Sequence, residues 1–531
     1  MEKSHNKEYT LSAFWLVLVV TALLVMASFM PSFSIGELNI KQRSIVSEIY
    51  ANHGQDQFFN SVLSYDSTAL LASAQIEIPQ ITDSLFSRLD LKSTSWTTSS
   101  YDFWDKQIYV NNQRPSTVRE DEYQLLSEIK IEDFGRKGAS EMDKFYQVLA
   151  RRGELGRPVR IAVLGDSFIE GDILTADIRE LLQKRYGGTG VGFVPFASPI
   201  AKFRGTVSHT FSGLTLHNLA QSSTVTTSIK DKFSISGLLA TAEQDAEIKF
   251  KGVSFRDNLK HFPKAKLLFI NEKNTVISVV VNDSLHKVFR PESNPNVQEI
   301  NINSSIEHLT IRITDPKGFI GYGVEMEGPE GVTVDNYSIR GSSGLSLFKT
   351  NPDINRQLNQ LLGYDLVILQ YGLNMMSPSM SNYTTYSNQM TRIIHYIREC
   401  FPGAAVLLMS VGDRSQNVGG AMTSMSVIHA MIAAQRQAAK ISGAAFWNTF
   451  EAMGGKNSMV TFVRNNWAAK DYTHMRYQGG RVIANRFVES LIEGQNNYLA
   501  RMEPKFDIPR YGPLLMGNIN PVIPVLYPKI D

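Results

Sequence analysis

Cysteine is almost absent from this chain, which has one, Cys400, among 531 residues. A single thiol excludes an intramolecular disulfide and a cysteine-rich metal cluster. The 53 basic and 51 acidic residues nearly cancel, so no excess of charge points to a nucleic-acid partner. A P-loop and a zinc-binding spacing are also missing, so the sequence implies no cofactor and no metal. Cys400 ends a helical pattern before Pro402, which favours a buried, inert side chain.

One long segment near the start lacks charge altogether. Leu11 to Met30 contains no charged side chain and is long enough to cross a bilayer. The small residues at Val25-Met-Ala27 are an alternative signal-peptide cleavage site. Because apolar residues continue to Met30, we expect an uncleaved anchor. The rest of the chain is then expected on the extracytoplasmic, periplasmic side of the membrane.

A short apolar segment farther along ends abruptly at a serine. Ile161 to Leu164 lacks polar alternation, as a fully buried parallel strand does. Gly165-Asp-Ser167 follows, and an amphipathic helical pattern begins near Leu174. A strand, a tight turn and a helix place Ser167 at the carboxyl edge of a sheet, where open α/β folds bind their ligands. Gly-Asp-Ser alone is also an ordinary turn, so the serine is a candidate nucleophile only.

Three more blocks follow this serine in chain order. A glycine block ends at Gly341, with Gly344 as the alternative; a Gly-x-Asn block ends at Asn374, directly after an apolar run; and an Asp-x-x-His block spans Asp471 and His474. Together with Gly-Asp-Ser, these blocks resemble those of the GDSL/SGNH hydrolase superfamily. The match covers about 156–203 and 334–495, less than half of the chain.

The resemblance implies the chemistry of a serine hydrolase. Ser167 would be the nucleophile, His474 the general base, and Asp471 the acid that orients the imidazole. The oxyanion hole would consist of the backbone N–H groups of Ser167 and Gly341 and the side-chain amide of Asn374.

Other carboxylates offer competing interpretations. Asp413 follows another predicted strand and is the rival to Asp471 for the acid. Glu170 and Asp172 form a pair of acids, as glycosidases require. Their position before a helix favours a role at its N-terminus instead.

Between the serine block and the glycine block the pattern changes to that of an antiparallel β structure. Alternating segments such as 275–281 and 309–314 are separated by turn signals, which predicts an inserted β-sandwich. Bacterial peptidoglycan O-acetylesterases of the superfamily are similar in carrying a carbohydrate-binding-like sandwich at this point. A lid or spacer without a ligand is the alternative.

The predicted fold class is therefore α/β, with a three-layer parallel-sheet SGNH hydrolase domain, an inserted β-sandwich and an N-terminal transmembrane helix. The predicted parts are an anchor at 1–30, a stalk and N-terminal extension at 31–155, the hydrolase domain at 156–203 plus 334–495, the sandwich at 204–333 and a tail at 496–531.

Three functions agree with this organisation. The first is a serine esterase that removes O-acetyl groups from a cell-envelope or extracellular polysaccharide; its partners would be an acetylated glycan and the membrane. The second is an O-acetyltransferase with the same triad, acting beside a membrane acyl-donor protein. The third is a non-catalytic glycan-binding protein of the envelope.

Overall fold

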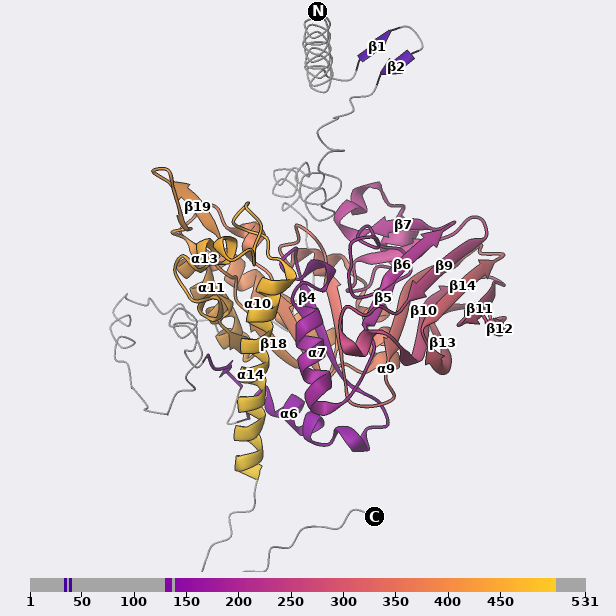
Figure 1. The fold of residues 1–531 in the computed structure, drawn as a ribbon, viewed down its shortest axis with the longest axis horizontal. Coiled ribbons are helices and arrows are strands. Elements are labelled where there is room, and N and C mark those ends of the chain that lie inside the picture. Colours follow the sequence, from indigo (N-terminus) through magenta and orange to yellow (C-terminus); the bar gives the residue numbers. More distant parts are fainter. Residues whose placement is uncertain (1–32, 36–37, 41–128, 136–138, 503–531) are drawn as a thin grey trace, which may run out of the picture.

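The computed structural model describes residues 33–35, 38–40, 129–135 and 139–502 (Figure 1). The expected anchor at Leu11 to Met30 lies outside these residues, as do most of the stalk and the end of the tail. Within the described part of the chain, no helix is long and apolar enough to cross a membrane. Ahead of the main body, β1 (Phe33–Ile35) and β2 (Leu38–Ile40) pair as an antiparallel ladder.

A six-stranded sheet forms the centre of the α/β part. Its first five strands are parallel, and the sixth, β3, is antiparallel at the edge. The apolar runs of the sequence are buried along their whole length here, because helices cover both faces. The order is β16 (Val332–Ser338), β4 (Val159–Gly165), β17 (Leu366–Gln370), β18 (Ala405–Met409), β21 (Ala445–Trp447) and β3 (Glu132–Asp133).

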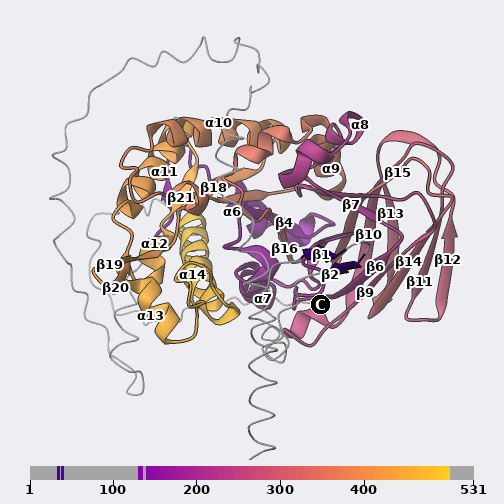
Figure 2. The same ribbon diagram turned by 90° about the horizontal axis from the view of Figure 1, so that it is seen from above.

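Helices form a layer on each face of this sheet (Figure 2). On one face α7 (Thr175–Tyr186) packs against α14 (Tyr477–Met502). On the other face α10 (Thr384–Cys400) packs against both α9 (Pro352–Leu362) and α11 (Ile428–Ser442). The result is a three-layer α/β arrangement, as expected from the sequence.

Two antiparallel sheets lie beside the α/β part and enclose a second apolar core. Strand β9 (Ala246–Lys251) shows why they form, since its buried and exposed side chains alternate. One sheet has the order β12 (Leu285–Phe289), β11 (Val276–Val281), β14 (His308–Thr314), β9, β6 (Ser208–Ser212). The other has the order β13 (Asn294–Ile306), β10 (Phe262–Asn271), β15 (Phe319–Glu327), β8 (Leu238–Thr241), β7 (Thr215–Asn218), with β5 (Gly192–Pro195) also paired to β15.

Three boundaries lie elsewhere than the sequence predicts. The antiparallel sheets begin with β5, before residue 204, because β5 pairs with β15. The predicted N-terminal extension contributes β3 and α6 (Asp143–Ala150) to the α/β part, where β3 pairs with β21 and α6 buries its apolar face. Helix α14 continues past residue 495, since Tyr498 still packs in the core.

A buried ion cluster joins the two parts. Arg160 of β4 is completely buried and contacts Glu325 at 2.6 Å, Asp335 at 3.4 Å and Glu327. Asp335 belongs to β16 of the parallel sheet, whereas the two glutamates belong to β15 of the antiparallel sheet. The cluster therefore connects the strand that leads to Ser167 with the β-sandwich.

Candidate active site

Three neighbouring parallel strands end at the same level, and the turns after them carry three of the candidate residues. Gly165 at the end of β4 pairs with Ser338 of β16 on one side and with Gln370 of β17 on the other. Ser167 follows β4 by two residues, and the glycine and asparagine blocks follow its two neighbours. Because the strands are parallel, all three turns meet at one edge of the sheet.

The serine turn is shaped by its own aspartate. The backbone N–H of Phe168 donates to Asp166 Oδ1 at 2.9 Å, which closes a tight turn around Ser167. A Cβ on Gly165 would lie 2.8 Å from the carbonyl oxygen of Gln370, so only glycine permits this approach of the strands. Ser167 itself is half-buried.

A histidine from the far end of the chain contacts this serine. His474 Nε2 lies 3.1 Å from Ser167 Oγ, although the two residues are 307 positions apart. His474 Nδ1 lies 2.6 Å from Asp471 Oδ2, and the Oδ1 of the same carboxylate accepts the backbone N–H of His474 at 3.0 Å. The 3.1 Å between His474 Nε2 and Ser167 Oγ agrees with the roughly 3 Å expected between a nucleophile and its base.

The carboxylate beside the histidine is held in its ionised form. Burial works to raise the pKa of Asp471, but hydrogen bonds from His474 and Thr473 lower that pKa below its ordinary value. An ionised carboxylate there keeps the proton on Nδ1, so that Nε2 is the atom that accepts the hydroxyl proton of Ser167.

The rival acid lies elsewhere. Asp413 is completely buried and accepts the backbone N–H of Met459 at 2.8 Å and the hydroxyl of Ser458 at 3.4 Å. It anchors the start of α13 (Ser458–Arg464), while Asp471 occupies the Nδ1 side of His474. The geometry thus favours Asp471 over Asp413.

Asn374 stands on the turn η7 (Leu373–Met375) after β17 and links the other two turns. Its Nδ2 donates to Asp166 Oδ2 and to the carbonyl oxygen of Ser342, both at 3.0 Å. Ser342 adjoins Gly341, which has a φ of 75° in the turn after β16. Asn374 therefore ties the turn that carries Ser167 to the turn that carries Gly341.

The alternative glycine has a structural reason to be glycine. Gly344 has a φ of 90°, and a Cβ there would meet the ring of Tyr371 at 3.2 Å. It begins the helical turn η6 (Leu345–Lys349). This close packing against Tyr371 explains why residue 344 is a glycine, and no contact to a substrate is needed to explain it.

Two residues near the site went unassigned in the sequence. Asp166 is completely buried, and burial raises its pKa to about 7. Arg414 donates to the carbonyl oxygen of Leu373 at 3.2 Å and lies close enough to Asp471 and Asp166 for both to affect its pKa. Asp166 lies inside the Gly-Asp-Ser block, and Arg414 lies in the loop after β18. These positions were the signals available in the sequence.

The paired acids near the serine form structural ion pairs. Glu170 accepts from Arg340 Nε at 2.9 Å. Asp172 accepts from Thr175 at 2.6 Å and contacts Arg204 at 2.8 Å. Both carboxylates are thus engaged within the protein, which argues against glycosidase chemistry. Within the described ranges, no group of three or more potential ligand side chains could hold a metal ion.

No protein-family model and no curated protein matches this sequence. Among solved structures, the chain is similar to a peptidoglycan O-acetylesterase, at 25% identity and a TM-score of 0.57, over 69% of this chain and 99% of that one. It is also similar to a family two carbohydrate esterase from Cellvibrio japonicus, at 9% identity and a TM-score of 0.23, over 55% and 99% of the chains. A third similar structure is the salicylyl-acyltransferase SsfX3 of a tetracycline biosynthetic pathway, at 12% identity and a TM-score of 0.25, over 57% and 96%.

Fold and motifs together define the class that this protein resembles, the GDSL/SGNH-type esterases. Within that class the resemblance is to O-acetylesterases.

Proposed function

We propose that this protein is a serine esterase that removes O-acetyl groups from a cell-envelope or extracellular polysaccharide. The observation that carries the proposal is the chain of contacts from Ser167 Oγ through His474 to Asp471, at 3.1 and 2.6 Å. The similarity to a peptidoglycan O-acetylesterase supports the choice of substrate and makes peptidoglycan the first glycan to test.

In the acylation step, His474 Nε2 takes the hydroxyl proton of Ser167 while Oγ attacks the acetyl carbonyl carbon. The tetrahedral intermediate collapses when His474 returns that proton to the departing sugar oxygen. The sugar leaves with a free hydroxyl, and the acetyl group remains on Ser167. Asp471 stabilises the imidazolium that forms between the two proton transfers.

The negative charge of the intermediate would be stabilised by the N–H groups of Ser167 and Gly341 and by Asn374. Both N–H bonds of the Asn374 amide are used in the resting site, on Asp166 and on the Ser342 carbonyl. The amide must therefore release one partner to bind the oxyanion. Such a donor is worth roughly 100- to 1,000-fold in rate.

In the second step a water molecule attacks the acetyl-serine. His474 takes one proton from the water and returns it to Ser167 Oγ, so that acetate leaves and the free enzyme is restored. A sugar hydroxyl in place of water would yield an acetylated sugar, which is the transferase reaction.

The test uses the full chain purified in detergent. We expect acetate release from O-acetylated peptidoglycan and from a chromogenic acetyl ester. Ser167→Ala should lower the rate by about 10⁴-fold or more, with an unchanged melting temperature. The matched control is Ser379→Ala, at an exposed serine, which should be fully active. Equal inactivity of the wild-type protein and Ser167→Ala on a broad acetyl-ester panel would contradict the proposal.

A product assay separates esterase from transferase. The enzyme is given a donor ester together with an acceptor oligosaccharide, and free acetate is compared with acetylated sugar. Free acetate as the main product is expected for the esterase.

We further propose that Leu11 to Met30 anchors the chain, with the catalytic part outside the cytoplasm. The uncharged run supports this. Protease added to intact spheroplasts should digest the catalytic part. Protection from the protease would contradict this location.

A further inference from the structure

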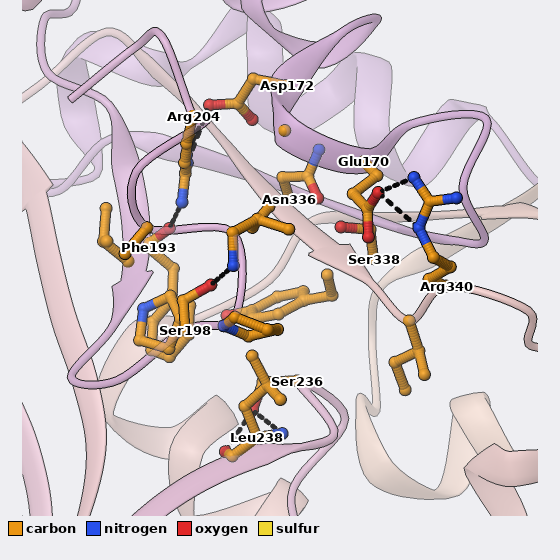
Figure 3. Close-up of a pocket in the computed structure, with 18 of the residues that line it drawn as sticks. Glu170, Asp172, Phe193, Ser198, Arg204, Ser236, Leu238, Asn336, Ser338 and Arg340 are labelled. Carbon is orange, nitrogen blue, oxygen red and sulfur yellow. Dashed lines mark hydrogen bonds and ion pairs between the residues drawn. The ribbon is translucent and has the colours of Figure 1, made fainter. Parts of the chain in front are cut away.

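A pocket lies where the α/β part meets the β-sandwich, and both parts form its walls (Figure 3). It encloses about 740 Å³ of free space, counting its open mouth. Glu170 and Arg340 come from the loops after β4 and β16, whereas Ser236 and Leu238 come from the sandwich side. Figure 3 shows these two pairs facing the pocket from opposite sides. We call it the junction pocket.

The junction pocket is adjacent to the proposed catalytic residues. The backbone N–H of Glu170 donates to the carbonyl oxygen of Ser167 at 3.4 Å. Arg340 directly precedes Gly341, and its guanidinium pairs with the Glu170 carboxylate. The loops that carry Ser167 and Gly341 therefore continue directly into the lining of the junction pocket.

The charged groups of the lining are already paired with one another. Glu170 pairs with Arg340, and Asp172 contacts Arg204 at 2.8 Å. Burial lowers the pKa of His209, which also lines the pocket, to about 4, so its ring is neutral at neutral pH. The lining thus favours an uncharged ligand over a phosphate or a carboxylate.

The remaining lining combines polar and apolar groups, as sugar recognition requires. Ser338 brings a hydroxyl group, and Asn218 brings an amide whose Oδ1 accepts the backbone N–H of Ala220. The hydroxyl of Ser236 donates to the carbonyl oxygen of Leu238 at 2.9 Å and holds this wall in place. Apolar surface comes from Leu238, the cross-strand neighbour of Asn218, and from several other lining side chains. A sugar ring presents hydroxyl and amide groups at its edge and C–H groups on its faces, which matches this mixture.

The two walls of the junction pocket are held in a fixed relation. Asp335 of β16 accepts the backbone N–H of Phe193 of β5 at 3.1 Å, and both strands contribute to the lining. Arg160 binds Asp335 together with Glu325 of the sandwich. The pocket is therefore formed before a ligand arrives, and such preorganisation lowers the entropic cost of binding.

We propose that the junction pocket is a subsite for an uncharged sugar unit of the glycan, next to the unit whose acetyl ester lies at Ser167. This inference rests on the proposed function and deepens it. The β-sandwich is then one wall of the substrate site. Binding depends on both parts of the chain, and the sandwich has no separate glycan site in this proposal.

The test measures binding in the full chain carrying Ser167→Ala, so that no substrate is consumed. An O-acetylated chitooligosaccharide is titrated by calorimetry, with an O-acetylated xylooligosaccharide as a second arm. Adding Leu238→Trp fills the pocket and should weaken binding by about tenfold or more. Adding Asn218→Ala removes one polar group and should weaken it by about fivefold, as expected for one hydrogen bond.

Matched substitutions elsewhere on the sandwich serve as controls. Leu285→Trp adds the same bulk at a residue that is 40% exposed on β12, and Asn301→Ala removes an exposed amide on β13. Both should bind like the Ser167→Ala parent. Melting temperatures identify any variant that fails to fold. If Leu238→Trp fails to fold, the binding measured for Asn218→Ala decides the test.

Two results would overturn the subsite. One is that Leu238→Trp and Asn218→Ala bind as tightly as the two controls. The other is that the Ser167→Ala protein binds neither oligosaccharide. Failure of the proposed function is a different result, namely no acetate release by the wild-type enzyme, and it can occur with the pocket still binding sugar.

Discussion

Asn374 and Asp166 show how single residues prepare this site. The amide of Asn374 faces a carboxylate and a carbonyl oxygen, both of which accept hydrogen bonds. These acceptors require the Nδ2 side of the amide, and not its oxygen, to lie between Asp166 and Ser342. Asp166 thereby orients a donor toward the turn that holds Ser167, so we regard it as a positioning residue.

The first prediction concerns the oxyanion donor. Asn374→Ala should lower kcat by about 100- to 1,000-fold and leave KM within a few-fold, because the lost interaction forms only in the transition state. Steady-state kinetics on a chromogenic acetyl ester provide the measurement. Asn301→Ala is the control and should match the wild type. A change in KM alone would show that Asn374 has another role.

The second prediction concerns pH and stability. Burial raises the pKa of Asp166 from 3.8 to about 7, so the folded protein binds this proton more tightly than the unfolded chain does. The stabilising contribution is complete below the unfolded pKa and is lost as the pH rises through the folded pKa. Asp166→Asn should remove this part of the pH dependence, on the order of 4 kcal/mol between about pH 3 and pH 8.

Urea unfolding at a series of pH values measures the difference. The control Asp245→Asn changes an exposed carboxylate and should follow the wild-type curve. Parallel curves for Asp166→Asn and the wild type would show that Asp166 does not titrate in this range.

At the scale of elements, helix α14 fixes the histidine loop against the serine loop. Gly480 in its first turn lies so close to the loop after Ser167 that a Cβ would come within 1.8 Å of the carbonyl oxygen of Ile173. Tyr477 of the same turn donates to the carbonyl oxygen of Gly171 at 2.6 Å. The start of α14 therefore determines how far His474 lies from Ser167.

The third prediction follows from this contact. Gly480→Ala forces α14 away from Ile173 and should lower the unfolding free energy by about 1–3 kcal/mol. It should also lower kcat, because the Ser167–His474 contact lengthens. Gly153→Ala is the control, since a Cβ there meets no atom within 4 Å. Equal stability and activity of the two variants would contradict the role of this contact.

At the scale of the whole molecule, the buried ion cluster joins the α/β part to the sandwich. Three carboxylates surround Arg160, and Lys266 lies 3.4 Å from Glu327. Burial raises the pKa of Glu325 well above its ordinary value despite the neighbouring arginine. A protonated Glu325 leaves two carboxylates opposite two cations, which balances the charge of the cluster.

The fourth prediction tests this junction. Arg160→Met leaves the buried carboxylates without their main partner and should cost about 3–5 kcal/mol of stability. Lys249→Met removes an exposed partner of Glu247 and should cost less than about 1 kcal/mol. Denaturant unfolding of both variants makes the comparison. A cost for Arg160→Met no larger than that for Lys249→Met would show that the cluster does not stabilise the junction.

Much of the fold could be predicted because the signals are local. The apolar run before Ser167 predicted β4, and the alternation in 246–253 predicted β9. The pattern before Pro402 predicted α10, with Cys400 buried at its end. Burial of a helix face or a strand depends on residues a few positions apart, so a short window contains the information.

The contacts of the site depend on the packing of distant segments. Asp413 and Asp471 both stand in loops beside the same sheet, and only the packing of α13 and α14 shows which one meets His474. The edge strand β3, the early sandwich strand β5 and the junction pocket likewise depend on partners far along the chain. Such pairings depend on the closure of long loops and on the fit of side chains from distant segments. A pattern of neighbouring residues contains no information about either.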